Sequence, residues 1–237
     1  MDKQALRERV WDALEASGEA RFPFPPHGRI PNFAGSRDAA DRLATRRAWR
    51  AADTVKANPD APQLPARRRA LREGKTVYVA VPRLREARCF LELDPARLEA
   101  EGVDTDDAAT IGGSDEHGVA LFPDDLPAID LILAGSVAVT EDGRRVGKGE
   151  GYSDLEFAIL REFGLVDDDT TTVTTVHELQ VVDEAVAVDG HDVPLDYVVT
   201  PERTVTTGAG AKPQGVDWDA LTDEKRGEIP VLERVRE

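Results

Sequence analysis

The most constraining feature of this chain is a series of short apolar segments that alternate with amphipathic ones. Residues 129–134 form the clearest buried strand, and residues 76–81, 89–93, 171–176 and 197–200 have the same strand-like composition. Strands that are apolar along their whole length must be covered on both faces. Because helical patterns lie between them, we predict an α/β fold with a mostly parallel, Rossmann-like sheet and helices on both faces.

Helices are expected where apolar residues recur at helical spacing. Asp2 can cap a first helix in which Leu6, Val10 and Leu14 recur every four residues, and Gly18 can end it. Further helices are expected after Ser36, at residues 65–73 and after residue 152. The segment 136–140 is expected to be another strand.

Length and composition limit the number of domains and the cell compartment. A chain of 237 residues can bury one substantial core, so we expect one domain at 1–206, followed by a linker and charged tail at 207–237. The chain has no apolar run long enough to span a membrane and no signal-peptide core at its start, which predicts a cytoplasmic protein without membrane contact. Its single cysteine, Cys89, lies in an apolar run and is expected to be a buried thiol.

The chain is strongly acidic, with 46 Asp and Glu against 30 Lys and Arg and a net charge of -16. Only six of the cations are lysines, and the acids gather in patches such as 104–107 and 167–169. High ionic strength screens this self-repulsion, so we interpret the charge as adaptation to salt. The same charge disfavours nonspecific nucleic-acid binding, and no nucleic-acid partner is expected.

A glycine-rich basic loop at residues 143–154 is the best indicator of function. It holds four glycines and three cations and ends in Asp154. Backbone amides and cations in such a loop can bind phosphate oxygens, and a nearby carboxylate can hold a metal. A glycine-rich segment can also be no more than a turn.

Residues 129–133 and the loop through Gly151, Tyr152, Ser153 and Asp154 together resemble the signature of the 5-formyltetrahydrofolate cyclo-ligase (methenyltetrahydrofolate synthetase) family. The segments 177–182 and 191–200 resemble two further family segments in the same order, and Lys3 and Arg7 match a lysine and an arginine of the family's first helix. The segments 30–33 and 55–60 are similar to those of a divergent branch, the methenyltetrahydrofolate synthase domain-containing proteins. Some members of that branch carry an RNA-recognition module, whose aromatic and basic pattern is not visible in this sequence.

The resemblance implies an ATP-dependent ring closure. In the family, ATP phosphorylates the formyl oxygen of 5-formyltetrahydrofolate, and N10 attacks the activated carbon to give 5,10-methenyltetrahydrofolate. By resemblance, the cofactors are ATP and Mg²⁺, the partner is a reduced folate, and the protein is a monomer or homodimer. The resemblance implies catalysis by Lys148, Arg145 and Tyr152, binding of Mg²⁺ by Asp154, and binding of ATP by Lys3, Arg7, Arg145, Gly147, Lys148, Gly149, Gly151 and Tyr152. For the folate we expect Gln63, Phe33, which glycine and proline place in a loop, and Gln180, which lies near a strand end.

Several residues depart from the family pattern. Ser153 and Leu155 replace a tyrosine and an arginine, and Glu150 places an acid inside the loop. Gln63 stands where the family has a glutamate that meets the pterin ring. Two alternatives therefore stay open: a non-catalytic or regulatory nucleotide-binding homologue, and a ligase for a different one-carbon or pterin substrate. Lys3 and Arg7 could also simply solvate a helix face, and Gln180 could have a purely structural role.

Overall fold

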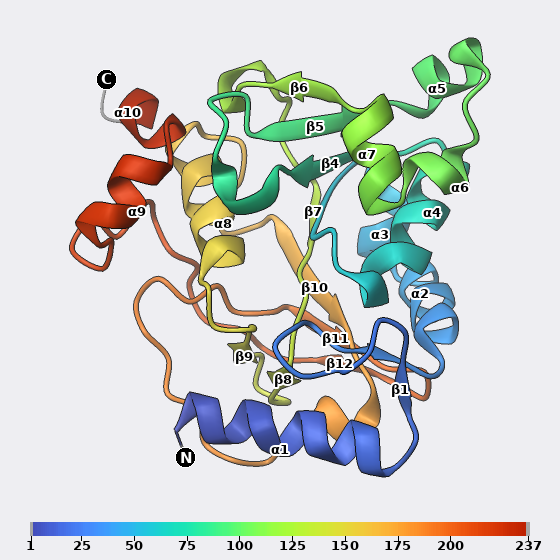
Figure 1. Ribbon diagram of the computed structural model, residues 1–237, viewed down its shortest axis with the longest axis vertical. Coiled ribbons are helices and arrows are strands. Elements are labelled where there is room, and N and C mark those ends of the chain that lie inside the picture. Colours follow the sequence, from blue (N-terminus) through green and yellow to red (C-terminus); the bar gives the residue numbers. More distant parts are fainter. Residues whose placement is uncertain (1, 236–237) are drawn as a thin grey trace.

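The computed structural model describes residues 2–235 and shows the predicted α/β architecture (Figure 1). An eight-stranded sheet has the order β12-β11-β10-β7-β3-β4-β5-β6. Its strands are β3 (Thr54–Ala57), β4 (Thr76–Ala80), β5 (Phe90–Leu93), β6 (Val119–Leu121), β7 (Leu131–Leu133), β10 (Thr171–Thr175), β11 (Tyr197–Val199) and β12 (Thr204–Thr206). The central strands from β11 to β4 are parallel, whereas β12, β5 and β6 pair antiparallel at the two edges.

Helices cover both faces of the sheet. Its helices are α1 (Lys3–Ala16), α2 (Ser36–Ala44), α3 (Arg47–Ala51), α4 (Leu64–Arg72), α5 (Pro95–Glu101), α6 (Thr105–Ala108), α7 (Ile111–His117), α8 (Tyr152–Glu162), α9 (Asp223–Glu228) and α10 (Val231–Val235). Short 3-10 turns add η1 (Ala61–Gln63), η2 (Pro82–Leu84), η3 (Pro123–Asp125) and η4 (Glu178–Gln180). Helices α2, α3 and α4 lie on one face, and α8 with α10 lies on the other (Figure 1).

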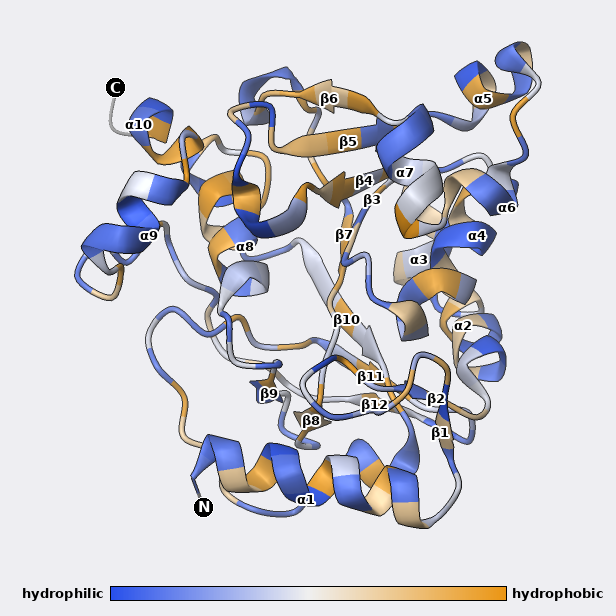
Figure 2. Cartoon of the chain, in the orientation of Figure 1, coloured by the Kyte–Doolittle hydropathy of each residue, from blue (hydrophilic) through white to orange (hydrophobic). Residues whose placement is uncertain are grey.

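Successive residues of the strands enter two different cores, because side chains alternate across a pleated sheet. Val77 and Val79 of β4 pack toward α2–α4, whereas Tyr78 and Ala80 pack toward α8. Figure 2 shows β4, β5 and β7 as largely hydrophobic. This double covering is the reason that the apolar strands could be recognised in the sequence.

Helix α1 belongs to a third cluster beside the main sheet. Asp2 caps it by accepting from the amide of Ala5, as predicted, and Leu6, Val10 and Leu14 are buried. They pack near the hairpin of β8 (Ala138–Val139) and β9 (Arg145–Val146). The strand expected at 136–140 therefore forms, but in a separate two-stranded sheet instead of the central one. A second small pair joins β1 (Ala20–Arg21) to β2 (Asn32–Phe33).

Two smaller expectations concern Cys89 and the chain after β12. Cys89 is buried as predicted, and burial raises the pKa of its thiol to about 12. The predicted boundary at residue 206 falls at the end of β12, and the residues beyond it fold back toward α8. Within residues 2–235, no helix is both long and apolar enough to cross a membrane.

Candidate functional site

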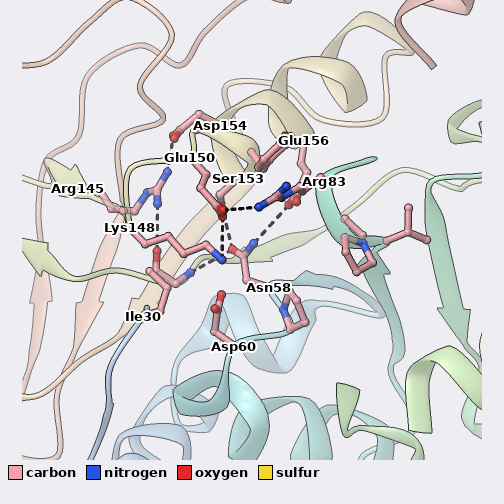
Figure 3. A pocket seen from close by; sticks show the side chains of 18 of the residues that line it. Ile30, Asn58, Asp60, Arg83, Arg145, Lys148, Glu150, Ser153, Asp154 and Glu156 are labelled. Carbon is pink, nitrogen blue, oxygen red and sulfur yellow. Dashed lines mark hydrogen bonds and ion pairs between the residues drawn. The ribbon is translucent and has the colours of Figure 1, made fainter. Parts of the chain in front are cut away.

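The main pocket, about 390 Å³, opens at the carboxyl ends of β3, β4 and β7 and faces the start of α8 (Figure 3). Strand β3 lies between β4, which follows it in the chain, and β7, which comes much later. In open α/β sheets, ligands bind where the strand order diverges in this way. The lining residues are Ile30, Asn58, Pro59, Asp60, Ala80, Val81, Pro82, Arg83, Ile111, Gly135, Arg145, Gly147, Lys148, Glu150, Gly151, Tyr152, Ser153, Asp154 and Glu156.

The glycine-rich loop joins β9 to α8 and forms one wall of this pocket. Gly151 is the N-cap of α8, with φ 72° and no side-chain hydrogen bond to the first-turn amides. The free amides and the helix dipole give this end of α8 a partial positive charge. At Gly149, φ is 108° and an added β-carbon would lie 3.4 Å from the Arg7 guanidinium carbon, so glycine suits both the backbone and the close approach.

Each cation that faces the pocket from the loop is already paired with protein groups. Lys148 Nζ lies 2.9 Å from Glu150 Oε2, and Arg83 Nη2 lies 3.7 Å from Glu150 Oε1. Arg145 pairs with Asp154 and donates to the Gly135 carbonyl at 3.0 Å. Figure 3 shows Glu150 between Lys148 and Arg83, with the pair of Arg145 and Asp154 beside them. A phosphate that binds to these cations must therefore displace the carboxylates that are paired with them.

Arg145 and Asp154 form a buried pair. Burial lowers the pKa of Arg145, but the Asp154 carboxylate outweighs that effect and the net pKa is raised. Asp154 Oδ1 also accepts from the Val193 amide at 3.0 Å. A Mg²⁺ ion bound directly to Asp154 would lie beside the guanidinium, and among the described pocket residues no group of three ligating side chains converges. Asp154 thus does not fit as the core of an all-protein magnesium site.

The floor of the pocket is a buried polar network that the sequence analysis missed. Lys56 of β3 pairs with Glu156 of α8, and both side chains are buried. Asn58 Nδ2 donates to Glu156 at 3.4 Å, while Asn58 Oδ1 accepts from Gly135 and from the Ser153 hydroxyl at 3.0 Å. The signal was present, because Lys56 and Glu156 are the charged residues inside an otherwise apolar strand and helix face. Ser153, a departure from the family pattern, is thus tied to the floor.

A second wall carries hydrogen-bond acceptors. A β-carbon added at Gly135 would lie 3.1 Å from Asp60 Oδ2 and 3.2 Å from Gln63 Oε1. Gln63 is fully buried, and its Oε1 accepts no hydrogen bond from any described residue. Burial raises the pKa of Asp60, which nearby Lys148 and Arg67 partly oppose. Gln63 is outside the pocket lining and lies against Gly135, so the side-chain acceptor that this wall offers to a ligand with N–H groups is the Asp60 carboxyl.

The remaining predicted residues lie outside this pocket lining. Lys3 Nζ binds Asp192 at 2.9 Å and Asp189 at 3.1 Å, whereas Arg7 Nε donates to the Gly147 carbonyl at 2.7 Å and supports the loop from behind. Buried Phe33 packs in the α1 cluster. Gln180 Nε2 donates to the carbonyls of Ser136 at 2.9 Å and Val137 at 3.2 Å. The predicted residues that the structure brings together in the pocket lining are Arg145, Gly147, Lys148, Gly151, Tyr152 and Asp154. Those that it leaves outside the lining are Lys3, Arg7, Phe33, Gln63, Gly149 and Gln180.

Comparison with known proteins agrees with this arrangement. The model of the 5-formyltetrahydrofolate cyclo-ligase family matches residues 1–201. The chain belongs to this family. Methenyltetrahydrofolate synthase domain-containing proteins of Mus musculus and Homo sapiens are 44% and 38% identical over 239 and 238 residues, which cover this whole chain but 64% and 62% of theirs.

A solved structure shows the same fold. The NMR structure of Aquifex aeolicus 5,10-methenyltetrahydrofolate synthetase superposes with a TM-score of 0.53 at 19% identity, covering 90% of this chain and 96% of that one. The cyclo-ligase family model ends at residue 201, whereas the match to the mammalian relatives continues through the C-terminal segment. Residues after 201 are therefore a feature shared with the domain-containing relatives.

Proposed function

We propose that this protein is an ATP-dependent cyclo-ligase that converts 5-formyltetrahydrofolate to 5,10-methenyltetrahydrofolate. The observation that carries the proposal is the division of one pocket into a cationic wall and an acceptor wall. Lys148, Arg145 and the start of α8 face the pocket on one side, and Asp60 faces it on the other. The phosphates of a triphosphate need cations and N–H donors, whereas the N–H groups of an amino-substituted ring need acceptors.

The cationic wall suits the triphosphate. Phosphoryl transfer depends mainly on positioning and on neutralising charge, and the loop offers amides, an ammonium and a guanidinium for this purpose. Lys148 is the residue best placed to leave Glu150 for a phosphate oxygen, because it is half-exposed, whereas Arg145 is buried against Asp154. Tyr152 lies at the mouth of the pocket as the first residue of α8.

Magnesium fits as a partner of the nucleotide. Mg²⁺ in nucleotide sites keeps several waters and is held mainly by substrate phosphates with one or two carboxylates. Glu150, or Asp154 through water, could supply that protein oxygen. Bound there, the ion would help to neutralise the charge on the phosphates.

The acceptor wall suits the pterin ring of a reduced folate. The ring edge of a pterin carries adjacent N–H groups, for which the Asp60 carboxylate provides an acceptor. In the proposed reaction the formyl oxygen accepts the γ-phosphoryl group, N10 forms a bond to the formyl carbon and loses its proton, and the oxygen departs as phosphate. The products are 5,10-methenyltetrahydrofolate, ADP and phosphate.

The test is turnover by purified protein in molar potassium chloride with ATP, magnesium and 5-formyltetrahydrofolate. We expect absorbance from methenyltetrahydrofolate together with an equal amount of ADP. Absence of both products would refute the proposal. The high salt follows from the interpretation of the acidic surface, which stays a prediction.

A second function is favoured by Glu150. Its carboxylate lies beside both Lys148 and Arg83, so the loop carries its own counter-ion in the pocket. A non-catalytic nucleotide-binding homologue would tolerate such competition, because binding alone does not require the geometry of transfer. Calorimetry separates the two functions: ATP binding without binding of reduced folates supports the homologue, and folate binding with turnover rules it out.

A further inference from the structure

The C-terminal segment, residues 207–235, is fastened to the face of the sheet that carries α8 (Figure 1). Buried apolar residues anchor it, and they are Val216, Ile229, Val231 and Leu232. Its polar contacts are also specific: Lys212 Nζ donates to the Asp168 carbonyl at 3.1 Å and to Asp196 at 2.9 Å, and the Val216 amide donates to Glu162 at 2.8 Å. A segment with these contacts is an integral layer of the fold.

This segment brings Lys225 of α9 to the back of the glycine-rich loop. Lys225 Nζ donates to the Glu150 carbonyl at 2.7 Å and lies 5.2 Å from the centre of the Tyr152 ring. It would also lie 3.6 Å from a β-carbon added at Gly151. One ammonium therefore contacts three consecutive residues at the junction between the loop and α8.

The partners of Lys225 distinguish it from an ordinary surface cation. Within residues 2–235, its ammonium contacts the Glu150 carbonyl and the Tyr152 ring and forms no ion pair with a carboxylate, although the chain has 46 acidic residues. A charged donor bound to a carbonyl and to an aromatic face contributes more than a neutral hydrogen bond does. The contact thus fixes the backbone of the loop instead of neutralising an acid.

Glu150 is where the two sides of the loop meet. Its carbonyl accepts from Lys225 behind the loop, while its carboxylate faces Lys148 and Arg83 at the pocket. If Lys148 leaves the carboxylate to bind phosphate, the carbonyl contact still holds Glu150 in place. Arg7 holds the Gly147 carbonyl in the same manner at the other end of the turn.

We propose that Lys225 is a positioning residue of the nucleotide site, supplied by a segment that lies outside the cyclo-ligase family model. It holds residues 150–152 so that the start of α8 faces the pocket, and its positive charge adds to the field that attracts an anion. The nucleotide part of this inference rests on the proposed function. The positioning part concerns the ligand-free protein.

The test uses the whole chain with Lys225→Met, Lys225→Arg and the control Arg234→Met. Arg234 pairs with Asp124 and Phe122, so the control removes a cation from the same segment without touching the loop. In ligand-free protein, Lys225→Met should speed hydrogen exchange of the Leu155 amide, which donates to the Gly151 carbonyl at 3.2 Å, about tenfold. Lys225→Arg should restore most of the protection, and Arg234→Met should leave it unchanged.

Nucleotide binding gives a second measurement. Lys225→Met should raise the KM for ATP about tenfold and leave the KM for the folate unchanged. A wild-type rate of Leu155 amide exchange in Lys225→Met overturns the inference, as does an increase in Arg234→Met that is as large as in Lys225→Met. If the wild-type protein binds no ATP, the proposed function fails and the exchange experiment alone decides the role of Lys225.

Discussion

The two walls of the pocket differ in whether their polar groups are already satisfied. On the loop side, Lys148 and Arg145 are paired with Glu150 and Asp154, so a ligand must replace existing partners. On the opposite side, the Asp60 carboxyl is partly buried and its pKa is raised by loss of solvent, so a ligand that donates N–H groups would supply what is missing. The charge of each wall therefore does not by itself predict which wall contributes more binding free energy. That contribution depends on which ion pairs and hydrogen bonds within the protein each group gives up when the ligand binds.

The largest expected effect concerns the floor shared by both walls. Lys56→Met leaves Glu156 buried without its partner and should lower the free energy of unfolding by about 3–5 kcal/mol. Urea denaturation measures this loss. The double variant Lys56→Met/Glu156→Leu should regain most of it, because a buried ion pair can be replaced by apolar groups. Equal stability of the single variant and the wild type would show that the pair is solvated.

Lys148→Ala tests the paired wall. If the ammonium exchanges Glu150 for phosphate, the variant should lose about 1–3 kcal/mol of ATP binding free energy in calorimetry, with folate binding unchanged. Arg144→Ala is the matched control, since Arg144 pairs with Asp142 away from the pocket lining. An unchanged ATP affinity would show that the Lys148 ammonium is solvated and does not contact a phosphate.

Asp60→Asn tests the acceptor wall. The amide gives a weaker acceptor than the carboxylate, so reduced-folate binding should weaken by about 1 kcal/mol while ATP binding stays the same. Asp115→Asn, an exposed site, serves as the control. Loss of ATP binding instead of folate binding would show that the wall with Asp60 binds ATP and not the folate.

The same variant predicts a pH dependence of stability. Burial raises the pKa of Asp60 above its ordinary value of 3.8. The folded protein therefore holds this proton more tightly than the unfolded chain, and ionisation of Asp60 destabilises the fold as the pH rises through its folded pKa. The melting temperature of Asp60→Asn should match the wild type below the unfolded pKa and exceed it near neutral pH. A difference that is constant with pH would contradict this.

Glu150→Gln should have the smallest effect and the opposite sign. Without the carboxylate, Lys148 and Arg83 no longer have an internal counter-ion, and ATP binding should tighten by about 0.5–1 kcal/mol. Calorimetry at low and molar salt should show the gain shrinking as salt rises. Weaker ATP binding in the variant would show that the carboxylate holds the loop in its binding form.

The sequence predicted the parts of the fold that depend on local pattern. Residues 131–133 form a central strand because their apolar side chains must enter cores on both faces, and α1 begins at the cap of Asp2. The segment 136–140 has the same composition as a central strand. In the structure, however, β8 pairs with β9 in a separate two-stranded sheet. Composition alone does not identify the partner of a short strand.

The site was partly predictable for a related reason. Arg145, Lys148, Tyr152 and Asp154 lie in one continuous motif, so their convergence on the pocket followed from the sequence. The pairing of Lys56 with Glu156 joins residues 100 positions apart and depends on tertiary packing. Lys225 was missed because its partner is a backbone carbonyl, which no sequence motif encodes.

The strand order has a consequence for how the protein could be divided. Strands β3 to β6 come from the chain before residue 122 and extend to one edge of the sheet, while β7 and the strands after it extend to the other. The pocket sits on the seam between β3 and β7, with Asn58 and Asp60 from the first half and Lys148 and Glu156 from the second. A ligand bound there would contact residues of both halves and would stabilise their association. Two fragments cut between β6 and β7 would each carry half of the pocket, and occupancy by a ligand would report that they had reassembled.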